Sequence, residues 1–194
     1  MNGLHDQPAH ATNLTPEERE GLIPVYIATR EELNEAELLN ILEADGWAFG
    51  RKRRLTDERF AKRLHGRMYG KVWTWAGAYR TTGKNIGVDA NLIQHRLYET
   101  MEQFYYWIDN STFSPDETAV RFHHALVSIH PFPNGNGRWS RLMADLLAVQ
   151  LGRPRFCWGG GALTAQGDVR DTYIAALQTA DNHDLSALIA FARS

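Results

Sequence analysis

Cysteine, long apolar runs and net charge are all scarce in this chain, and each absence removes a class of protein. The single cysteine, Cys157, excludes an internal disulfide framework and a cluster of cysteines around a metal. No apolar run approaches the roughly 20 residues that a membrane-spanning helix needs. The formal charge of −2 gives no overall attraction to nucleic acid. Residues 1–12 are polar and lack the apolar segment of a secretory signal, so we expect a cytoplasmic protein.

What the chain does contain is typical of one folded domain. Of its 194 residues 43% are hydrophobic, and six are tryptophans, which is enough for one well-filled core. We expect a single compact unit, in which residues 1–50 form an N-terminal helical extension packed on a main domain of residues 51–194.

Helix signals recur along the sequence and predict a mainly α fold. Capping boxes start at Thr15 and Thr29, and Ser114 begins a third with proline at the first helical position. The helix after Thr29 should run through several leucines to Gly46. The triplet at 159–161 is all glycine and predicts a flexible connection. Apolar residues at helical spacing predict further helices over about 57–69, 91–109, 138–151, 169–177 and 185–192.

Residues 130–141 form the most informative stretch, which reads HPFPNGNGRWSR. The helix that begins near Ser114 should end before Pro131, which places His130 at its C-terminal edge. A glycine-rich turn follows, and then a helix that carries Arg138 and Arg141 on one face of its first turn. Asn-Gly pairs often only connect two helices. A simple connection, however, needs neither the imidazole nor the paired arginines.

Each part of this stretch has a chemical use. An imidazole accepts a proton near neutral pH. Glycines let consecutive backbone N–H groups converge on an anion, and a helix start adds free donors and a positive dipole end. Arginine forks bind phosphate oxygens in pairs. A base beside a polyphosphate site predicts transfer of a phosphorus-containing group onto a group that the base deprotonates.

The stretch resembles the signature of the Fic-domain family, His-x-Phe-x-(Asp/Glu)-Gly-Asn-Gly-Arg-x-x-Arg, at every fixed position except one. Fic enzymes typically transfer AMP from ATP to a Ser, Thr or Tyr hydroxyl of a target protein and release pyrophosphate. The resemblance therefore implies a Fic-type helical bundle over residues 51–194. It also implies a nucleotidyltransferase that carries out AMPylation, with ATP as the donor and Mg²⁺ bound to the ATP.

The family signature also implies a role for each matched residue. His130 would be the general base that deprotonates the target hydroxyl, and Phe132 would be the buried anchor of the loop. The resemblance further implies that the α- and β-phosphates are bound by Gly135, Asn136, Gly137 and Arg138. Arg141 would bind the γ-phosphate.

Asn134 is the position that departs from the family pattern, which usually has a carboxylate that coordinates Mg²⁺. An amide oxygen is neutral and is a weaker ligand for this cation. We therefore expect Asn134 to contribute only weakly to the binding of Mg–ATP. Low activity, a different metal and a different donor all stay open.

Residues 72–88 are similar to the stretch that forms the flap of Fic proteins. Two short runs, 81–82 and 86–88, flank Gly83-Lys84-Asn85, a spacing that predicts a short β-hairpin. In the family this hairpin clamps the target segment by strand addition. A surface hairpin that only connects two elements is the alternative. The resemblance implies that the target docks on Thr82, Gly83, Lys84, Asn85, Ile86 and Gly87.

The overall pattern, including Asn134 and residues 29–47, resembles the subgroup called mobile mystery protein B. That group is bacterial and is often paired with a small helix-turn-helix protein, which the resemblance implies as a partner here. Neither a membrane nor direct contact with nucleic acid is expected. Many Fic proteins are inhibited by a helix with the motif Ser/Thr-x-x-x-Glu-Gly/Asn. No segment matches it, so we expect no inhibition through that motif.

The predicted function is thus a protein adenylyltransferase with His130 as base and residues 135–141 as phosphate site. Two alternatives stay open. One is a phosphodiesterase that removes AMP from a modified protein. The other is a catalytically weak Fic module that acts as the partner of a helix-turn-helix protein, and Asn134 is the residue that keeps it open.

Overall fold

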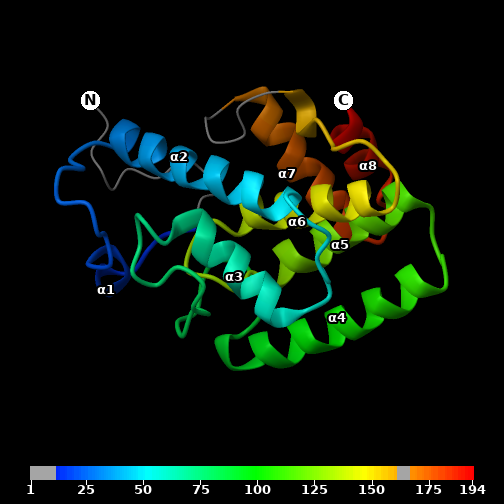
Figure 1. Cartoon of the computed structure of the whole chain (residues 1–194), viewed down its shortest axis with the longest axis horizontal. Coiled ribbons are helices and arrows are strands. Elements are labelled where there is room, and N and C mark those ends of the chain that lie inside the picture. The colour runs from blue at the N-terminus through cyan, green and yellow to red at the C-terminus, as the bar shows by residue number, and fades with distance from the viewer. Residues whose placement is uncertain (1–11, 161–166) are drawn as a thin grey trace.

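The computed structural model describes residues 12–160 and 167–194, and helices dominate this part of the chain (Figure 1). The mainly α fold predicted from the sequence is therefore confirmed. The described helices are α1 (Pro16–Arg19), α2 (Arg30–Phe49), α3 (Glu58–Tyr69), the 3₁₀ turn η1 (Ala90–Leu92), α4 (Ile93–Asp109), α5 (Pro115–Ile129), α6 (Asn136–Gln150), the 3₁₀ turn η2 (Trp158–Gly160), α7 (Asp168–Asp181) and α8 (Ser186–Arg193).

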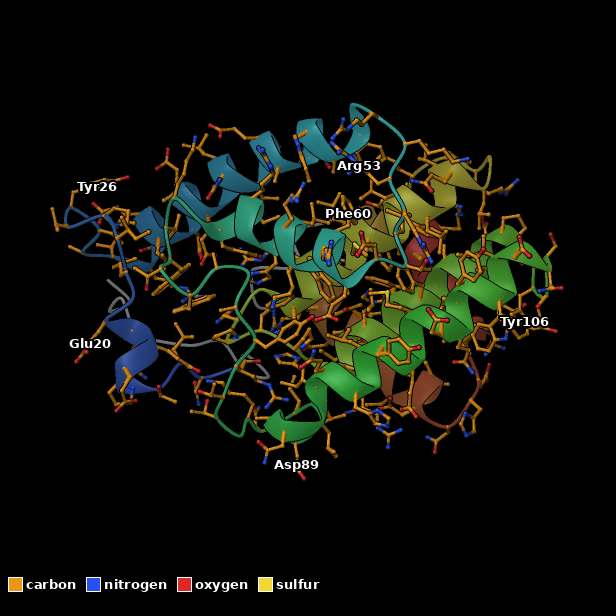
Figure 2. The ribbon with its side chains drawn as sticks, turned by 60° about the horizontal axis from the view of Figure 1, so that its bottom comes forward. Glu20, Tyr26, Arg53, Phe60, Asp89 and Tyr106 are labelled. Atoms are coloured by element: carbon orange, nitrogen blue, oxygen red, sulfur yellow. The ribbon has the colours of Figure 1, made fainter. Side chains whose placement is uncertain are left out.

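Helices α5 and α6 pack against each other at the centre, and the loop 130–135 joins them. Helix α4 lies along the outer side of α5 between the labelled residues Asp89 and Tyr106 (Figure 2), and α8 also contacts α5. Helices α2 and α3 pack together and both contact α6. Large side chains in this centre are fully buried, and burial of each stabilises the fold by roughly 1.5–3 kcal/mol relative to exposure. They include Phe104, Phe122, Leu126, Trp139, Met143 and Leu147.

The capping boxes predicted at the N-termini of α1 and α2 are present. The Thr15 hydroxyl accepts from the Glu18 N–H at 3.2 Å, and the Glu18 carboxylate accepts from the Thr15 N–H at 2.8 Å. Thr29 and Glu32 make the same reciprocal pair at 3.2 and 3.0 Å. These side chains satisfy donors that have no partner within a helix, which fixes where each helix begins.

Helix α2 differs from the prediction in its length and in the face that it buries. It continues through Gly46 to Phe49, because a glycine inside a helix lowers its stability by only about 1 kcal/mol. Its leucines at 38, 39 and 42 are 55%, 59% and 60% exposed. The buried face is partly polar and consists of Leu33, Glu37, Asn40, Ala44 and Ala48.

The predicted β-hairpin flap at 81–88 is wrong, because no sheet is found among the described residues. Residues 80–88 form an irregular loop whose polar backbone groups bind the side chain of Arg80. Its guanidinium donates to the carbonyls of Thr82, at 2.9 Å, and of Val88. The Val88 N–H donates to the Ile129 carbonyl at 3.3 Å. The groups that a hairpin would pair across its strands are therefore already used. The β pairing that is described is a single antiparallel bridge between Leu22 and Trp73.

Two further expectations concern connections and membranes. The predicted flexible connection at 159–161 lies partly outside the described residues, and its first two glycines belong to η2. Within the described ranges, no helix combines the length and apolar character needed to cross a membrane. The domain boundary expected at residue 51 stays a prediction.

Candidate active site

The loop between α5 and α6 is fixed by buried side chains at both of its ends. Phe132 is fully buried, with its ring stacked on His65 at a centroid distance of 3.7 Å and edge-on to Trp139 at 5.0 Å. The side chain of Asn136 closes the loop: its Oδ1 accepts from the Phe132 N–H at 2.9 Å and its Nδ2 donates to the Phe132 carbonyl at 2.8 Å. The side-chain amide of Asn136 therefore maintains the loop, and its backbone N–H has no partner among the described residues.

Gly135 makes the turn from this loop into α6. Its φ of 78° lies in the left-handed region, and a Cβ at this position would lie 2.5 Å from Cζ of Tyr69. A side chain would therefore be strained by the backbone conformation and would also collide with a buried ring. Glycine is needed here for the loop to reach the helix.

Three consecutive backbone N–H groups are open at the start of α6. Within the described ranges, no group accepts from the N–H of Asn136, Gly137 or Arg138. The first N–H groups of a helix have no intrahelical partner and lie at the positive end of its dipole. This arrangement suits an anion such as a phosphate group.

His130 ends α5 in the left-handed conformation, with φ 54° and ψ 59°. A residue other than glycine keeps this uncommon conformation only where its surroundings fix it. The imidazole is buried, and its Nε2 lies 2.8 Å from the hydroxyl oxygen of Thr12. Burial lowers the pKa of His130 to about 4, and the nearby charges of Arg80 and Lys84 act in the same direction. The ring is therefore neutral near pH 7 and can accept the hydroxyl hydrogen.

Arg80 holds the backbone on which this imidazole is mounted. Its Nε donates to the His130 carbonyl at 2.7 Å, and its backbone N–H donates to the Pro131 carbonyl at 2.9 Å. Gly87 lies against the same residue, because a Cβ there would be 2.6 Å from Cβ of His130. The loop 80–88 is thus packed directly on the candidate base.

Arg138 is held by a glutamate from α2. Its Nη2 lies 2.7 Å from a carboxylate oxygen of Glu37, whose side chain is 6% exposed. The other Glu37 oxygen accepts from the indole N–H of Trp73 at 2.8 Å. Burial lowers the pKa of Arg138, but the Glu37 carboxylate outweighs this effect, so the net shift is upward. One of the two predicted phosphate-binding arginines is therefore already paired in this structure.

Arg141 has no such partner. In the described part of the chain, no carboxylate forms an ion pair with it. Its guanidinium lies over the ring of Tyr173, 5.3 Å from the centroid, and one of its nitrogens would be 3.5 Å from a Cβ on Gly137. Arg141 therefore lies close to the open N–H groups and is available to an anion there.

Asn134 does not make a metal site by itself. Its amide oxygen accepts from the Gly135 N–H at 2.6 Å, and its amide nitrogen donates to the Thr12 carbonyl at 3.4 Å. Among the residues that the structure describes, no three His, Cys, Asp or Glu side chains form a group that could hold a metal ion. The residues present therefore do not fit a metal ion bound by the protein alone.

His65 links α3 to the loop and was not predicted as a site residue. Its Nδ1 accepts from the Gly77 N–H at 3.0 Å, so its Nε2 carries the hydrogen and donates to the Asn134 carbonyl at 3.0 Å. Burial lowers the pKa of His65 to about 3, which keeps the ring in the neutral form that satisfies both partners.

The residues predicted to form the flap separate into two groups. Lys84 donates to Glu18 at 2.5 Å, and Thr82 donates to the other oxygen of that carboxylate at 3.1 Å. Gly87 packs on His130 as described above. The other three residues are exposed and have no side-chain hydrogen bond among the described residues; they are Gly83, Asn85 and Ile86.

Four residues of the site were not predicted from the sequence; they are Thr12, Glu37, His65 and Arg80. For Glu37 a signal was available, because it lies at helical spacing between Leu33 and Ala44 on the face that α2 buries. A carboxylate on a buried face requires a cationic or hydrogen-bonding partner. The other three had no comparable local signal.

Known proteins match the part of the chain that carries this candidate site. The model of the Fic/DOC family matches residues 55–148, which include loop 80–88, His130 and both arginines. A Fido domain-containing protein of Dictyostelium discoideum is 31% identical over 111 residues, which cover 55% of this chain and 73% of that protein. Protein adenylyltransferase fic-1 of Caenorhabditis elegans is 29% identical over 119 residues, 60% of this chain. The chain spans only 22% of the length of that adenylyltransferase.

Solved structures share the fold. BepC of Bartonella tribocorum, in a structure with bound AMPPNP, has a TM-score of 0.70 at 16% identity and covers 92% of this chain and 97% of that chain. Fic-1 of Caenorhabditis elegans has a TM-score of 0.67 at 24% identity, with 90% and 51% covered.

The family predicted from the signature is thereby confirmed, and the protein has the mainly helical Fic fold. The finer resemblance to mobile mystery protein B is not shown and stays a prediction. On the extent of the matches to the family model and to the Dictyostelium protein, this chain belongs to the Fic/Fido domain family.

Proposed function

We propose that this chain is a protein adenylyltransferase that moves AMP from ATP to a Ser, Thr or Tyr hydroxyl of a target protein. One observation carries the proposal: a hydroxyl oxygen lies 2.8 Å from Nε2 of His130, next to a loop with three open N–H groups. A hydroxyl paired with a neutral imidazole is how enzymes activate an oxygen nucleophile. The relatives named as adenylyltransferases support the same activity.

In the proposed reaction, His130 accepts the proton of the target hydroxyl. The hydroxyl oxygen attacks the α-phosphorus of ATP, and the bond between that phosphorus and the bridging oxygen to the β-phosphate breaks. AMP is then joined to the target by a phosphodiester, and pyrophosphate leaves. The charges of a bound triphosphate would raise the pKa of His130 from its value without a ligand, which makes the ring a stronger base when the donor is present.

The start of α6 supplies the electrostatic part of the proposal. The N–H groups of residues 136–138 would bind phosphate oxygens, and Arg141 would bind the γ-phosphate and so orient the α-phosphorus for in-line attack. Arg138 would assist after it leaves Glu37. Mg²⁺ enters this proposal as part of the Mg–ATP substrate, since Asn134 offers at most one neutral oxygen that already accepts a hydrogen bond.

A catalytically weak module is the second candidate, and the pairing of Arg138 with Glu37 favours it. In this form the chain would act chiefly through a partner, for which the sequence resemblance suggests a small helix-turn-helix protein. Removal of AMP from a modified protein is a different reaction on the same residues: water attacks the phosphorus of the phosphodiester, the bond to the target oxygen breaks, and AMP leaves. The target protein, in either reaction, would dock against loop 80–88, a role that rests on the resemblance alone.

Labelled ATP tests the proposal. The chain, candidate bacterial proteins and Mg²⁺ are incubated with ATP labelled at either the α- or the γ-phosphorus. Transfer of the α-label but not the γ-label to protein supports adenylylation, while γ-label on protein would indicate phosphorylation. No transfer of either label, with AMP released from a modified protein, would replace the proposal by hydrolytic removal of AMP. If neither assay shows a reaction, the result supports the second candidate, a catalytically weak module.

A further inference from the structure

Residues 12–18 of this chain lie across the candidate active site. Leu14 is buried in the core, and the indole N–H of Trp75 donates to the Glu18 carbonyl at 2.9 Å. The Glu18 carboxylate accepts from Lys84 and from Thr82, both in loop 80–88. The segment is therefore anchored to the core at one residue and to the loop at another.

Two backbone carbonyls of the segment are bound by site residues. The Thr12 carbonyl accepts from the Asn134 amide at 3.4 Å, and the Asn13 carbonyl accepts from the Lys84 ammonium at 2.8 Å. Asn134 belongs to the loop that leads into the anion site, and Lys84 belongs to loop 80–88. The segment is thus held through its main chain between the two loops, as an extended peptide substrate is held in many enzymes.

This docking brings one side-chain hydroxyl to the candidate base. Thr12 is 7% exposed, and its Oγ1 lies 2.8 Å from Nε2 of His130. The neighbouring hydroxyls have other uses: Thr15 caps α1, and Thr82 donates to Glu18. A segment that only blocked the site would be expected to place a large side chain next to the His130 imidazole. What it presents instead is a nucleophile that is hydrogen-bonded to a base.

We propose that Thr12 is an intramolecular acceptor of the nucleotidyl group, an inference that rests on the proposed adenylyltransferase function. His130 takes the hydroxyl proton of Thr12, and Oγ1 attacks the α-phosphorus of a nucleoside triphosphate. The bond from that phosphorus to the β-phosphate oxygen breaks, and pyrophosphate leaves. The product is a nucleoside monophosphate joined to Thr12 by a phosphodiester. It has no hydroxyl hydrogen for His130 and carries a new negative charge, so residues 12–18 are expected to leave the imidazole.

Peptide mapping of the full chain tests this inference. The chain is incubated with ATP and Mg²⁺ and digested with trypsin, which releases residues 1–19 as one peptide whose only hydroxyl side chains are Thr12 and Thr15. Fragmentation of that peptide then assigns the adduct to one of the two. The variants are Thr12→Ser, which keeps the nucleophile, and Thr12→Val, which keeps the shape without it. Thr15→Asn is the matched control, because asparagine retains the helix cap and removes the other hydroxyl.

The expected result is an AMP adduct at position 12 in the parent chain, in Thr12→Ser and in Thr15→Asn, and no adduct there in Thr12→Val. The first-order rate constant for formation of this adduct should not change with protein concentration over a tenfold range.

An adduct on Thr15, or one that survives Thr12→Val, overturns the inference but leaves adenylyl transfer as the proposed function. The inference is also overturned if Thr12 stays unmodified in the parent chain while Thr12→Val transfers AMP to other proteins faster. In that case Thr12 would only block the site. Absence of transfer to any protein contradicts the proposed function itself. Should Thr12→Val fail to fold, mapping of the parent chain and Thr12→Ser still decides between Thr12 and Thr15.

Discussion

Glu37 of α2 and Arg138, in the first turn of α6, form an ion pair at 2.7 Å. Glu37 is almost fully buried and is held by the Trp73 indole N–H, so its carboxylate is fixed in place rather than free to move in solvent. A phosphate oxygen that binds Arg138 must compete with this carboxylate. We therefore expect the pair to limit how tightly the site binds a nucleotide.

Glu37→Gln is expected to increase the affinity for ATP by about tenfold, which corresponds to about 1.4 kcal/mol. The amide still accepts from Trp73 but no longer neutralises Arg138. The loss of the buried ion pair should lower the free energy of unfolding by about 1–3 kcal/mol. Calorimetric titration with ATP measures the first effect and urea unfolding the second. The control is Glu35→Gln, which removes the same charge from an exposed position of the same helix. Equal ATP affinities in both variants would show that Glu37 does not compete with the ligand.

Gly135→Ala is expected to weaken ATP binding and to destabilise the fold by more than the backbone conformation alone explains. Gly152 provides the matched control. It has φ 80° against 78° for Gly135, but a Cβ on Gly152 meets nothing within 4 Å. Gly152→Ala should therefore cost only the roughly 1–2 kcal/mol of a left-handed alanine. Thermal unfolding with and without ATP compares the two. Similar losses in both variants would mean that the contact with Tyr69 does not limit position 135.

Arg80→Lys is expected to release loop 80–88 from His130. A lysine cannot bind three carbonyls in fixed directions as the guanidinium does, so we expect a loss of about 2–3 kcal/mol. Hydrogen exchange at the Val88 N–H should accelerate. Transfer activity should fall, because the imidazole of His130 is no longer held in place. The exposed Arg63→Lys in α3 serves as control and should change stability by no more than about 0.5 kcal/mol. Unchanged exchange at Val88 would show that Arg80 does not hold the loop.

The buried histidines make stability depend on pH. Burial lowers the pKa of His65 to about 3 and that of His130 to about 4, while an unfolded chain keeps histidine near 6.5. Between these values the unfolded state binds more protons, so stability rises with pH. Lowering the pH from 7 to 5 should reduce the free energy of unfolding by about 2 kcal/mol for each of these rings.

His65→Gln tests the share of that ring, because glutamine can accept from Gly77 and donate to Asn134 without titrating. Its stability should be lower than that of the parent chain at pH 7, but it should lose about 2 kcal/mol less between pH 7 and pH 5. Urea unfolding at the two pH values measures the difference. Parallel pH dependence in the two proteins would contradict a neutral buried His65.

The parts of the fold that could be predicted are those decided by neighbours in the sequence. Thr15, Thr29 and Ser114 fixed three helix starts, because a cap acts within one turn of its own helix. His130 was expected at the end of its helix because a proline follows it, and the structure places it there. The signature itself was enough to predict the family.

The parts that were missed depend on contacts between distant segments. The hairpin at 81–88 had suitable spacing, but Arg80 takes the carbonyls that the strands would have used. Glu37 and Arg138 lie on different helices, so only the packing of α2 on α6 brings them together. The contact between Thr12 and His130 likewise joins residues that are 118 positions apart in the sequence. Sequence spacing carries no information about such pairs.

His130→Ala shows whether His130 removes a proton from an acceptor hydroxyl beside a bound triphosphate. The measurement is the rate of α-labelled AMP transfer to protein, with ATP affinity and melting temperature determined on the same sample. His124→Ala, at a neighbouring histidine of α5 that pairs with Asp181, is the matched control. We expect His130→Ala to lower transfer by about 10²–10⁴-fold while ATP still binds, and His124→Ala to transfer at nearly the parent rate. Transfer by His130→Ala at the parent rate would contradict this role of His130.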